Sequence, residues 1–197
     1  METLEARPVS AAPAPRETQR IPLLVVGIVL FLGSELMFFS SLFGMYFTLR
    51  AQNAVWTPPD VKVDAIRLLS TAILVASSGT MQMATHRIKQ GRAASMKRWI
   101  VLTFLMGAAF LGFQAHEWMT STFQIATNAY GSAFFSMTGF HGLHVFAGLV
   151  IMLVILGRAA TGAYSREEHA AVEVATYYWH FVDVVWIGLF TTIFVIR

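Results

Sequence analysis

The feature that most constrains this sequence is a long apolar segment near its start. From Ile21 to Leu49 the only charged residue is Glu35. A helix needs about 20 residues to cross a hydrocarbon core of about 30 Å, so this segment predicts a transmembrane helix. Similar apolar segments predict further helices over about 65–85, 98–118, 130–156 and 172–196. We therefore expect an all-α fold, a polytopic membrane helix bundle of five transmembrane helices over residues 21–197.

The composition and the placement of charge support a membrane protein. Apolar residues make up 56% of the chain and charged residues 13%, about half the charged share of an ordinary soluble domain. The absence of cysteine excludes disulfides, iron–sulfur clusters, c-type haem attachment and thiolate metal sites. The net charge of +3 could suggest nucleic acid, but the basic residues cluster at helix ends and in short loops. Membrane topology explains that distribution better, so no nucleic-acid partner is expected.

Two segments outside the apolar runs have a distinct composition. Residues 1–20 are polar and proline-containing, which predicts a disordered cytoplasmic tail. The apolar stretch that follows is too long for a cleaved signal peptide. Residues 50–64 contain WTPPD (56–60), and its two prolines exclude a helix there.

Lysine and arginine are distributed unevenly between the two sides of the expected bundle. Placing the N-terminus inside puts ten of these residues on the cytoplasmic side and four on the outer side. Cytoplasmic loops of membrane proteins carry the excess of positive charge. We therefore predict a multi-pass membrane protein with its N-terminus on the cytoplasmic side and its C-terminus outside.

Glu35 lies near the middle of the first apolar segment. A charge at the centre of a bilayer costs about 2.5–3.5 kcal/mol on insertion scales, so we expect this carboxyl to be neutral or hydrogen-bonded. The flanking Gly33 and Gly44 suit close contact with another helix. Two interpretations stay open: a carboxyl at a subunit contact or beside a proton path, and a hydrogen-bonded packing residue.

His141 and His144 lie in the segment TGFHGLHVFAG (138–148). A spacing of three residues places both on one face of a helix. Histidines in this arrangement can ligate a metal, with His116 or Glu117 as further ligands. The alternative, which the pattern favours, is hydrogen bonding to neighbouring helices.

His180 and Asp183 lie in YYWHFVDVVW (177–186), also three residues apart. An ion pair between them would lower the cost of burying either group. The pair could act as a proton relay or contribute a haem ligand, but an interhelical hydrogen-bond lock is favoured.

Aromatic and basic residues mark the expected membrane interfaces. Trp56 and Arg158 are candidates for contact with lipid headgroups, and the basic loop over 86–98 is expected near anionic ones. Interface anchors are expected at Trp56, Trp99, Trp118, Tyr130, Tyr177, Tyr178 and Trp179.

Several of these strings together resemble one family. The chain is similar to subunit III of cytochrome c oxidase, a haem–copper oxidase, over about residues 22–197. The resemblance is carried by SELMFFSSLFGMYF (34–47), WTPPD (56–60), QAHEW (114–118), YGSAFFSMTGFHGLHVFAG (130–148) and YYWHFVDVVWIGLF (177–190). The long form of this subunit has seven helices, and this chain resembles the last five, as in short bacterial forms.

The resemblance implies a subunit without a redox centre of its own. It implies direct packing on subunit I, which carries the haems and a copper, with subunit II and a small subunit in the same complex. Such a complex transfers electrons from cytochrome c to oxygen and translocates protons in the respiratory chain. The subunit is implied to support proton uptake and complex stability, and to bind phospholipid in a cleft whose second wall this short form lacks.

The resemblance also assigns residues. Glu35 falls on the family's buried carboxyl at the subunit I contact. Polar motifs of the family fall on His141, His144, His180 and Asp183, and weaker matches on Glu117, Arg158 and Glu173. No catalytic or metal-ligating residue is implied in this chain.

Other functions are weighed against this one. A quinol oxidase or a nitric oxide reductase-associated complex could carry a similar subunit, because the donor site lies on other chains. A stand-alone haem protein would need axial ligands, but His141 and His144 are expected toward the outer side and His180 toward the inner side. A proton-coupled transporter around Glu35 would be expected to show paired, broken helices, and the sequence has no matching second half.

Overall fold

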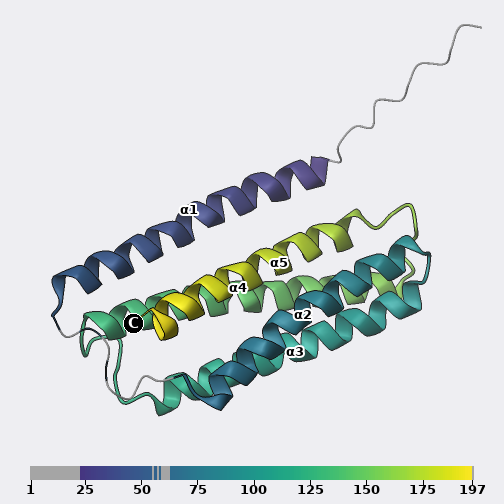
Figure 1. Cartoon of the computed structure of the whole chain (residues 1–197). Coiled ribbons are helices and arrows are strands. Elements are labelled where there is room, and N and C mark those ends of the chain that lie inside the picture. Colours follow the sequence, from purple (N-terminus) through teal and green to yellow (C-terminus); the bar gives the residue numbers. More distant parts are fainter. Residues whose placement is uncertain (1–22, 55, 57, 59–62, 197) are drawn as a thin grey trace, which may run out of the picture.

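The structure, a computed structural model, describes residues 23–54, 56, 58 and 63–196, and within them the expected five-helix, all-α fold is confirmed (Figure 1). The expected tail over 1–20 and most of the WTPPD segment lie outside the described residues. The elements are α1 (Leu23–Gln52), α2 (Ala65–Lys89), α3 (Ala93–Thr120), α4 (Ala129–Ala160), α5 (Ala170–Phe190) and a short π-helix, η1 (Thr191–Val195).

The helices run alternately up and down, so the connections lie at two ends of the bundle. The α2–α3 and α4–α5 connections share one end with the start of α1 (Figure 1). We call this the basic end, because it carries Arg87, Lys89, Arg92, Lys97, Arg98, Arg158 and Arg166. The opposite end holds the α1–α2 and α3–α4 connections and the end of α5 (Figure 1).

Helix ends follow local signals that the apolar pattern did not show. Asp64 caps α2 by accepting from the amide of Arg67 at 2.8 Å, and Asn128 caps α4 by accepting from Gly131 at 2.7 Å. Gly91 turns the chain after α2 with a φ of 74°, a left-handed conformation that suits glycine. α3 therefore begins at Ala93, earlier than expected, because its first basic residues are helical rather than part of a loop.

Four of the helices are long and apolar enough to cross a membrane, namely α1, α3, α4 and α5 continued through η1. The exception is α2, which has 25 residues and the length to cross, at about 1.5 Å per residue, but a more polar composition. It packs most extensively against α3 and also against α5. Its polar side chains therefore have helix partners rather than lipid.

The core of the bundle is built around Trp179 of α5, which is fully buried. A Cβ added to Gly107 of α3 would lie 2.7 Å from the indole, and one added to Gly148 of α4 would also lie at 2.7 Å. The glycines thus form the space that the ring fills. The expectation that Trp179 anchors the membrane interface is wrong, and so is the same expectation for the buried Tyr130.

α1 lies at the side of the bundle against α4 and α5 (Figure 1). Its buried residues are Phe39, Leu42 and Tyr46, all in its second half. A Cβ on Gly33 or Gly44 would meet nothing within 4 Å, so the expectation that these glycines support close helix contact is wrong within the described chain. α1 therefore presents a long apolar surface away from the bundle.

Candidate functional site

The contact between Glu35 and His144 joins α1 to α4. Glu35 Oε2 lies 2.9 Å from His144 Nε2, and the side chains are 21% and 14% exposed. His144 Nδ1 lies 2.7 Å from the carbonyl oxygen of Phe140, which can only accept, so Nδ1 carries a proton. The remaining proton is then shared between the carboxyl and Nε2. In either arrangement, neutral acid with neutral imidazole or carboxylate with imidazolium, the pair carries no net charge.

Aromatic rings and a third helix enclose this pair. Phe39 of α1 meets the imidazole edge-on at 5.0 Å, and Phe38 stacks at 6.5 Å. Tyr178 of α5 donates its hydroxyl proton to the carbonyl of His144 at 2.9 Å. Glu35 is near the middle of α1, so the pair lies at the depth where an unpaired charge is most costly.

His141 points away from its neighbour in the motif. It is fully buried, stacked on Trp186 at 4.8 Å and edge-on to Phe110 at 5.8 Å. Neither ring nitrogen has a hydrogen-bond partner among the described residues. His141 and His144 do not contact the same neighbours, although the sequence places both on one face of the helix. Residues three apart differ by about 60° around a helix, and this angle is enough for the two side chains to pack against different residues.

His180 and Asp183 do come together, through a residue of α2. Ser78 donates to Asp183 Oδ2, and His180 Nδ1 lies 2.9 Å from the same hydroxyl oxygen. His180 Nε2 lies 3.0 Å from Gln82 Oε1. A direct ion pair between His180 and Asp183 is not formed, because the serine hydroxyl lies between them. The two side chains instead make interhelical hydrogen bonds, the arrangement that the sequence favours. The arrangement ties α5 to α2.

Further hydrogen bonds extend this contact along both helices. Trp186 donates to Thr71 at 3.1 Å, Trp179 donates to Ser77 at 2.9 Å, and the hydroxyls of Thr85 and Thr176 lie 2.7 Å apart. We call the α2 residues of this contact the α2 polar seam: Thr71, Ser77, Ser78, Gln82 and Thr85. Sequence reasoning missed it, although Thr71, Ser78 and Thr85 recur every seven residues, a spacing that marks one helix face.

The weaker candidates lie near the helix ends. Glu117 pairs with Arg67 Nε at 2.9 Å, which joins α3 to α2. Glu173 of α5 pairs with Lys89 at the end of α2 and lies 3.6 Å from His169 Nε2. Both acids thus link helices at opposite ends of the bundle. Neither of them lies beside the Glu35–His144 pair.

The two lipid-headgroup candidates have contacts inside the chain. Trp56 donates its indole N–H to the Tyr46 hydroxyl at 3.0 Å and meets Tyr130 edge-on. Arg158 lies over the Tyr164 ring, 5.7 Å from its centroid. Trp56 therefore uses its only side-chain donor internally, which gives a headgroup contact no support, whereas Arg158 is exposed.

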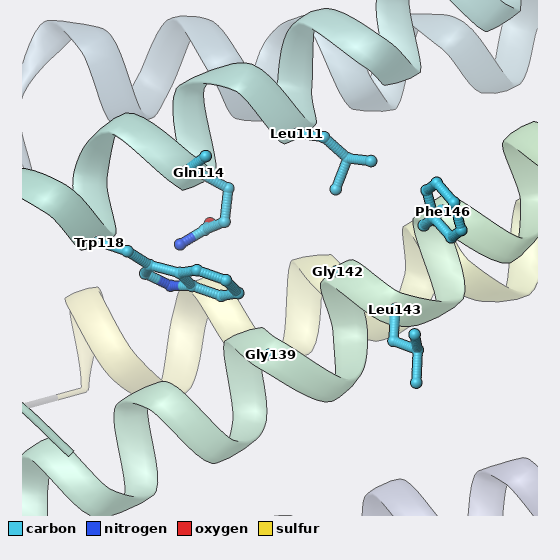
Figure 2. Close-up of a pocket in the computed structure, with 8 residues that line it drawn as sticks. Leu111, Gln114, Trp118, Gly139, Gly142, Leu143 and Phe146 are labelled. Carbon is cyan, nitrogen blue, oxygen red and sulfur yellow. The ribbon is translucent and has the colours of Figure 1, made fainter.

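A groove on the opposite side of the histidine motif lies between α3 and α4. In Figure 2, Gln114 and Trp118 of α3 lie over the stretch of α4 from Gly139 to Gly142. The cavity has a volume of about 370 Å³, and Trp118 donates to Thr138 at 3.2 Å. The glycines thus leave an apolar hollow beside the bundle, away from Glu35.

The polar groups described above are the Glu35–His144 pair, which shares a proton, and the hydrogen bonds that join neighbouring helices. No group of three or more His, Asp or Glu side chains among them is arranged to hold a metal ion. His141, a buried histidine whose ring nitrogens have no hydrogen-bond partner among the described residues, is covered by Phe110 and Trp186 rather than open to a ligand.

Comparison with known proteins identifies the family. The sequence profile of the family described as "Cytochrome c oxidase subunit III" matches residues 18–196. A probable cytochrome c oxidase subunit 3 of Nocardia farcinica is 44% identical over 177 residues, 87% of each chain. Cytochrome c oxidase subunit 3 of Thermostichus vulcanus is 38% identical over 174 residues, again 87% of each chain. The subunit of Heterololigo bleekeri is 42% identical over 86% of this chain and 68% of its own length. The profile match spans all five helices and the relatives align over most of the chain, so this chain belongs to the cytochrome c oxidase subunit III family.

Proposed function

We propose that this chain is the non-redox subunit III of a haem–copper terminal oxidase in a bacterial plasma membrane. In this proposal it packs directly on subunit I, beside subunit II, and the assembled complex oxidises cytochrome c, reduces oxygen and translocates protons. The observation that carries the proposal is the family match over residues 18–196. The apolar, largely unburied α1 supports it, because such a helix needs lipid or a partner subunit along its exposed sides.

The proposed contribution of the chain is indirect. The bundle is locked internally through the α2 polar seam, so it can serve as a rigid support for a neighbouring subunit. The Glu35–His144 pair holds one exchangeable proton at mid-membrane depth without net charge. Placed at the subunit contact, that pair would stabilise the proton-uptake side of subunit I without itself being a catalytic group.

The proposed orientation places the basic end in the cytoplasm. Seven of the described Lys and Arg residues lie there, and anionic headgroups and the positive-inside tendency both favour that side. α2 is proposed as the fifth span, because its neighbours α1 and α3 both qualify as spans and run antiparallel to it (Figure 1).

Deletion of the chain from its host tests the proposed role. The purified oxidase is expected to keep its haem spectrum and its initial rate but to lose activity faster during continuous turnover. Re-expression of the wild-type chain should restore the lifetime. An oxidase that keeps normal turnover stability without the chain would contradict the proposal.

A further inference from the structure

A hollow at the basic end lies between the last turn of α2 and the first turns of α3. It has a volume of about 380 Å³ and is lined by Arg87, Ser95, Arg98, Trp99 and Leu102. It is separate from the Glu35–His144 pair and from the α2 polar seam. Four of its residues occur at spacings of three, four and seven along α3, so they form one face of that helix.

The charges at this hollow are not neutralised within the described chain. Lys89 pairs with Glu173, whereas neither Arg87 nor Arg98 has an ion pair with a described carboxylate. Arg87 Nε is buried and finds no acceptor among the described residues, and its Nη1 has one long contact of 3.4 Å to Gln90. Two guanidinium groups and a serine hydroxyl therefore line one hollow without an anion of their own.

The hollow changes from polar to apolar along the membrane normal. If α3 is centred in the bilayer, Ser95 and Arg98 lie about 17 Å and about 13 Å from the middle, and Leu102 lies about 7 Å from it. The hydrocarbon region begins at about 15 Å, so Ser95 lies at headgroup depth and Leu102 at acyl depth. Arg98 lies just inside the boundary, from which its long side chain can reach the headgroups. Leu102 is 41% exposed, and Trp99 lies between the two levels as an interfacial tryptophan would.

We propose that this hollow binds one anionic phospholipid. The phosphate accepts hydrogen bonds from Arg87, Arg98 and the Ser95 hydroxyl, and one acyl chain lies against Trp99 and Leu102. Guanidinium groups suit phosphate because they present several donors in a plane. The apolar lower part favours a lipid over free phosphate, and the lack of a carboxylate in the lining gives a choline group no counter-charge.

Native mass spectrometry of the full-length chain in neutral detergent tests this site. The probes are phosphatidylglycerol, phosphatidylcholine and inorganic phosphate. Phosphatidylglycerol is expected to bind in preference to phosphatidylcholine, and excess inorganic phosphate is expected not to displace it. The double variant Arg87→Gln, Arg98→Gln should lower the apparent affinity for phosphatidylglycerol about tenfold or more.

A matched control removes the same charge from outside the hollow. Arg92 and Lys97 lie in the same basic segment but do not line the hollow. The double variant Arg92→Gln, Lys97→Gln should therefore change the affinity for phosphatidylglycerol less than about twofold. Ser95→Asp provides a variant that is expected to fold, because an acidic residue suits the first turn of a helix, yet its carboxylate should repel the phosphate. Equal losses in both double variants, equal binding of the two lipids, displacement by inorganic phosphate, or full binding by Ser95→Asp would overturn the proposal.

Discussion

At the residue scale, Glu35 and His144 show how a membrane helix accommodates a carboxyl. The carbonyl of Phe140 fixes the His144 tautomer, and the carboxyl then meets the remaining ring nitrogen. Sharing one proton keeps the pair neutral, so neither group carries an isolated charge at mid-membrane depth. The pair also joins α1 to α4, in a region where few other residues of α1 are buried.

Removing the carboxyl should therefore weaken the attachment of α1. Glu35→Ala is expected to lower the free energy of unfolding by about 1 kcal/mol, because it leaves His144 Nε2 without its partner. Glu35→Gln should have a smaller effect, since the amide can still donate to that nitrogen. Reversible denaturant unfolding in detergent, followed by circular dichroism, measures both, with Ser34→Ala on the same helix as the control. Equal stability of wild type and Glu35→Ala would show that the contact does not hold α1.

At the element scale, the polar side chains of α2 join this helix to α5. The α2 polar seam accepts hydrogen bonds from Trp186 and Trp179 of α5. Through Ser78 it donates one to Asp183 and shares one with His180. These groups explain why α2 is less apolar than the other helices, because its polar atoms are satisfied by neighbours rather than by water. α2 can therefore cross a membrane inside the bundle without a strongly apolar sequence.

The position of α2 can be tested with cysteines, since the chain has none of its own. Ala54→Cys lies after α1 and Gln90→Cys after α2, and both sites are exposed. In intact cells an impermeant maleimide is expected to label Ala54→Cys and to reach Gln90→Cys only after the membrane is opened. Labelling of both positions from the same side would mean that α2 does not cross, and reversed labelling would mean that the orientation is inverted.

Close approach of α3 to α5 depends on one glycine. Gly107→Ala should lower the free energy of unfolding by about 1–3 kcal/mol, because the new Cβ would lie 2.7 Å from the Trp179 ring and 2.9 Å from Leu149. Gly112→Ala, on the same helix, meets nothing within 4 Å and should leave stability unchanged or slightly higher. Thermal unfolding measures both variants. If the two substitutions change the Tm by the same amount, the packing around Trp179 is not as described.

The apolar segments predicted the helices because crossing a membrane fixes their length and composition. They did not predict which polar residues meet, because that depends on how neighbouring helices are rotated. Ser78 lies between His180 and Asp183 for this reason, and His141 faces Trp186 rather than Glu35. The aromatic pattern predicts Trp179 at the interface, but the ring is buried because glycines on two other helices form the space that encloses it.

At the scale of the whole molecule, four helices pack around a common core and the fifth, α1, exposes most of its apolar surface. α2 to α5 pack around Trp179, whereas α1 leaves apolar residues such as Leu30 and Met37 exposed at 71% and 77%. Unpartnered apolar surface on this scale suits lipid and a partner subunit together. We therefore propose that the chain is a supporting subunit, because it belongs to the subunit III family and its helices are joined by internal hydrogen bonds.

Affinity purification of the tagged chain from mild-detergent extracts of its host membrane tests this claim most directly. We expect equimolar recovery of a large polytopic chain that carries haem, together with a donor-binding subunit, and no Soret band from the chain purified alone. Recovery of the chain without any haem-carrying partner, or with stoichiometric haem on the isolated chain, would contradict it.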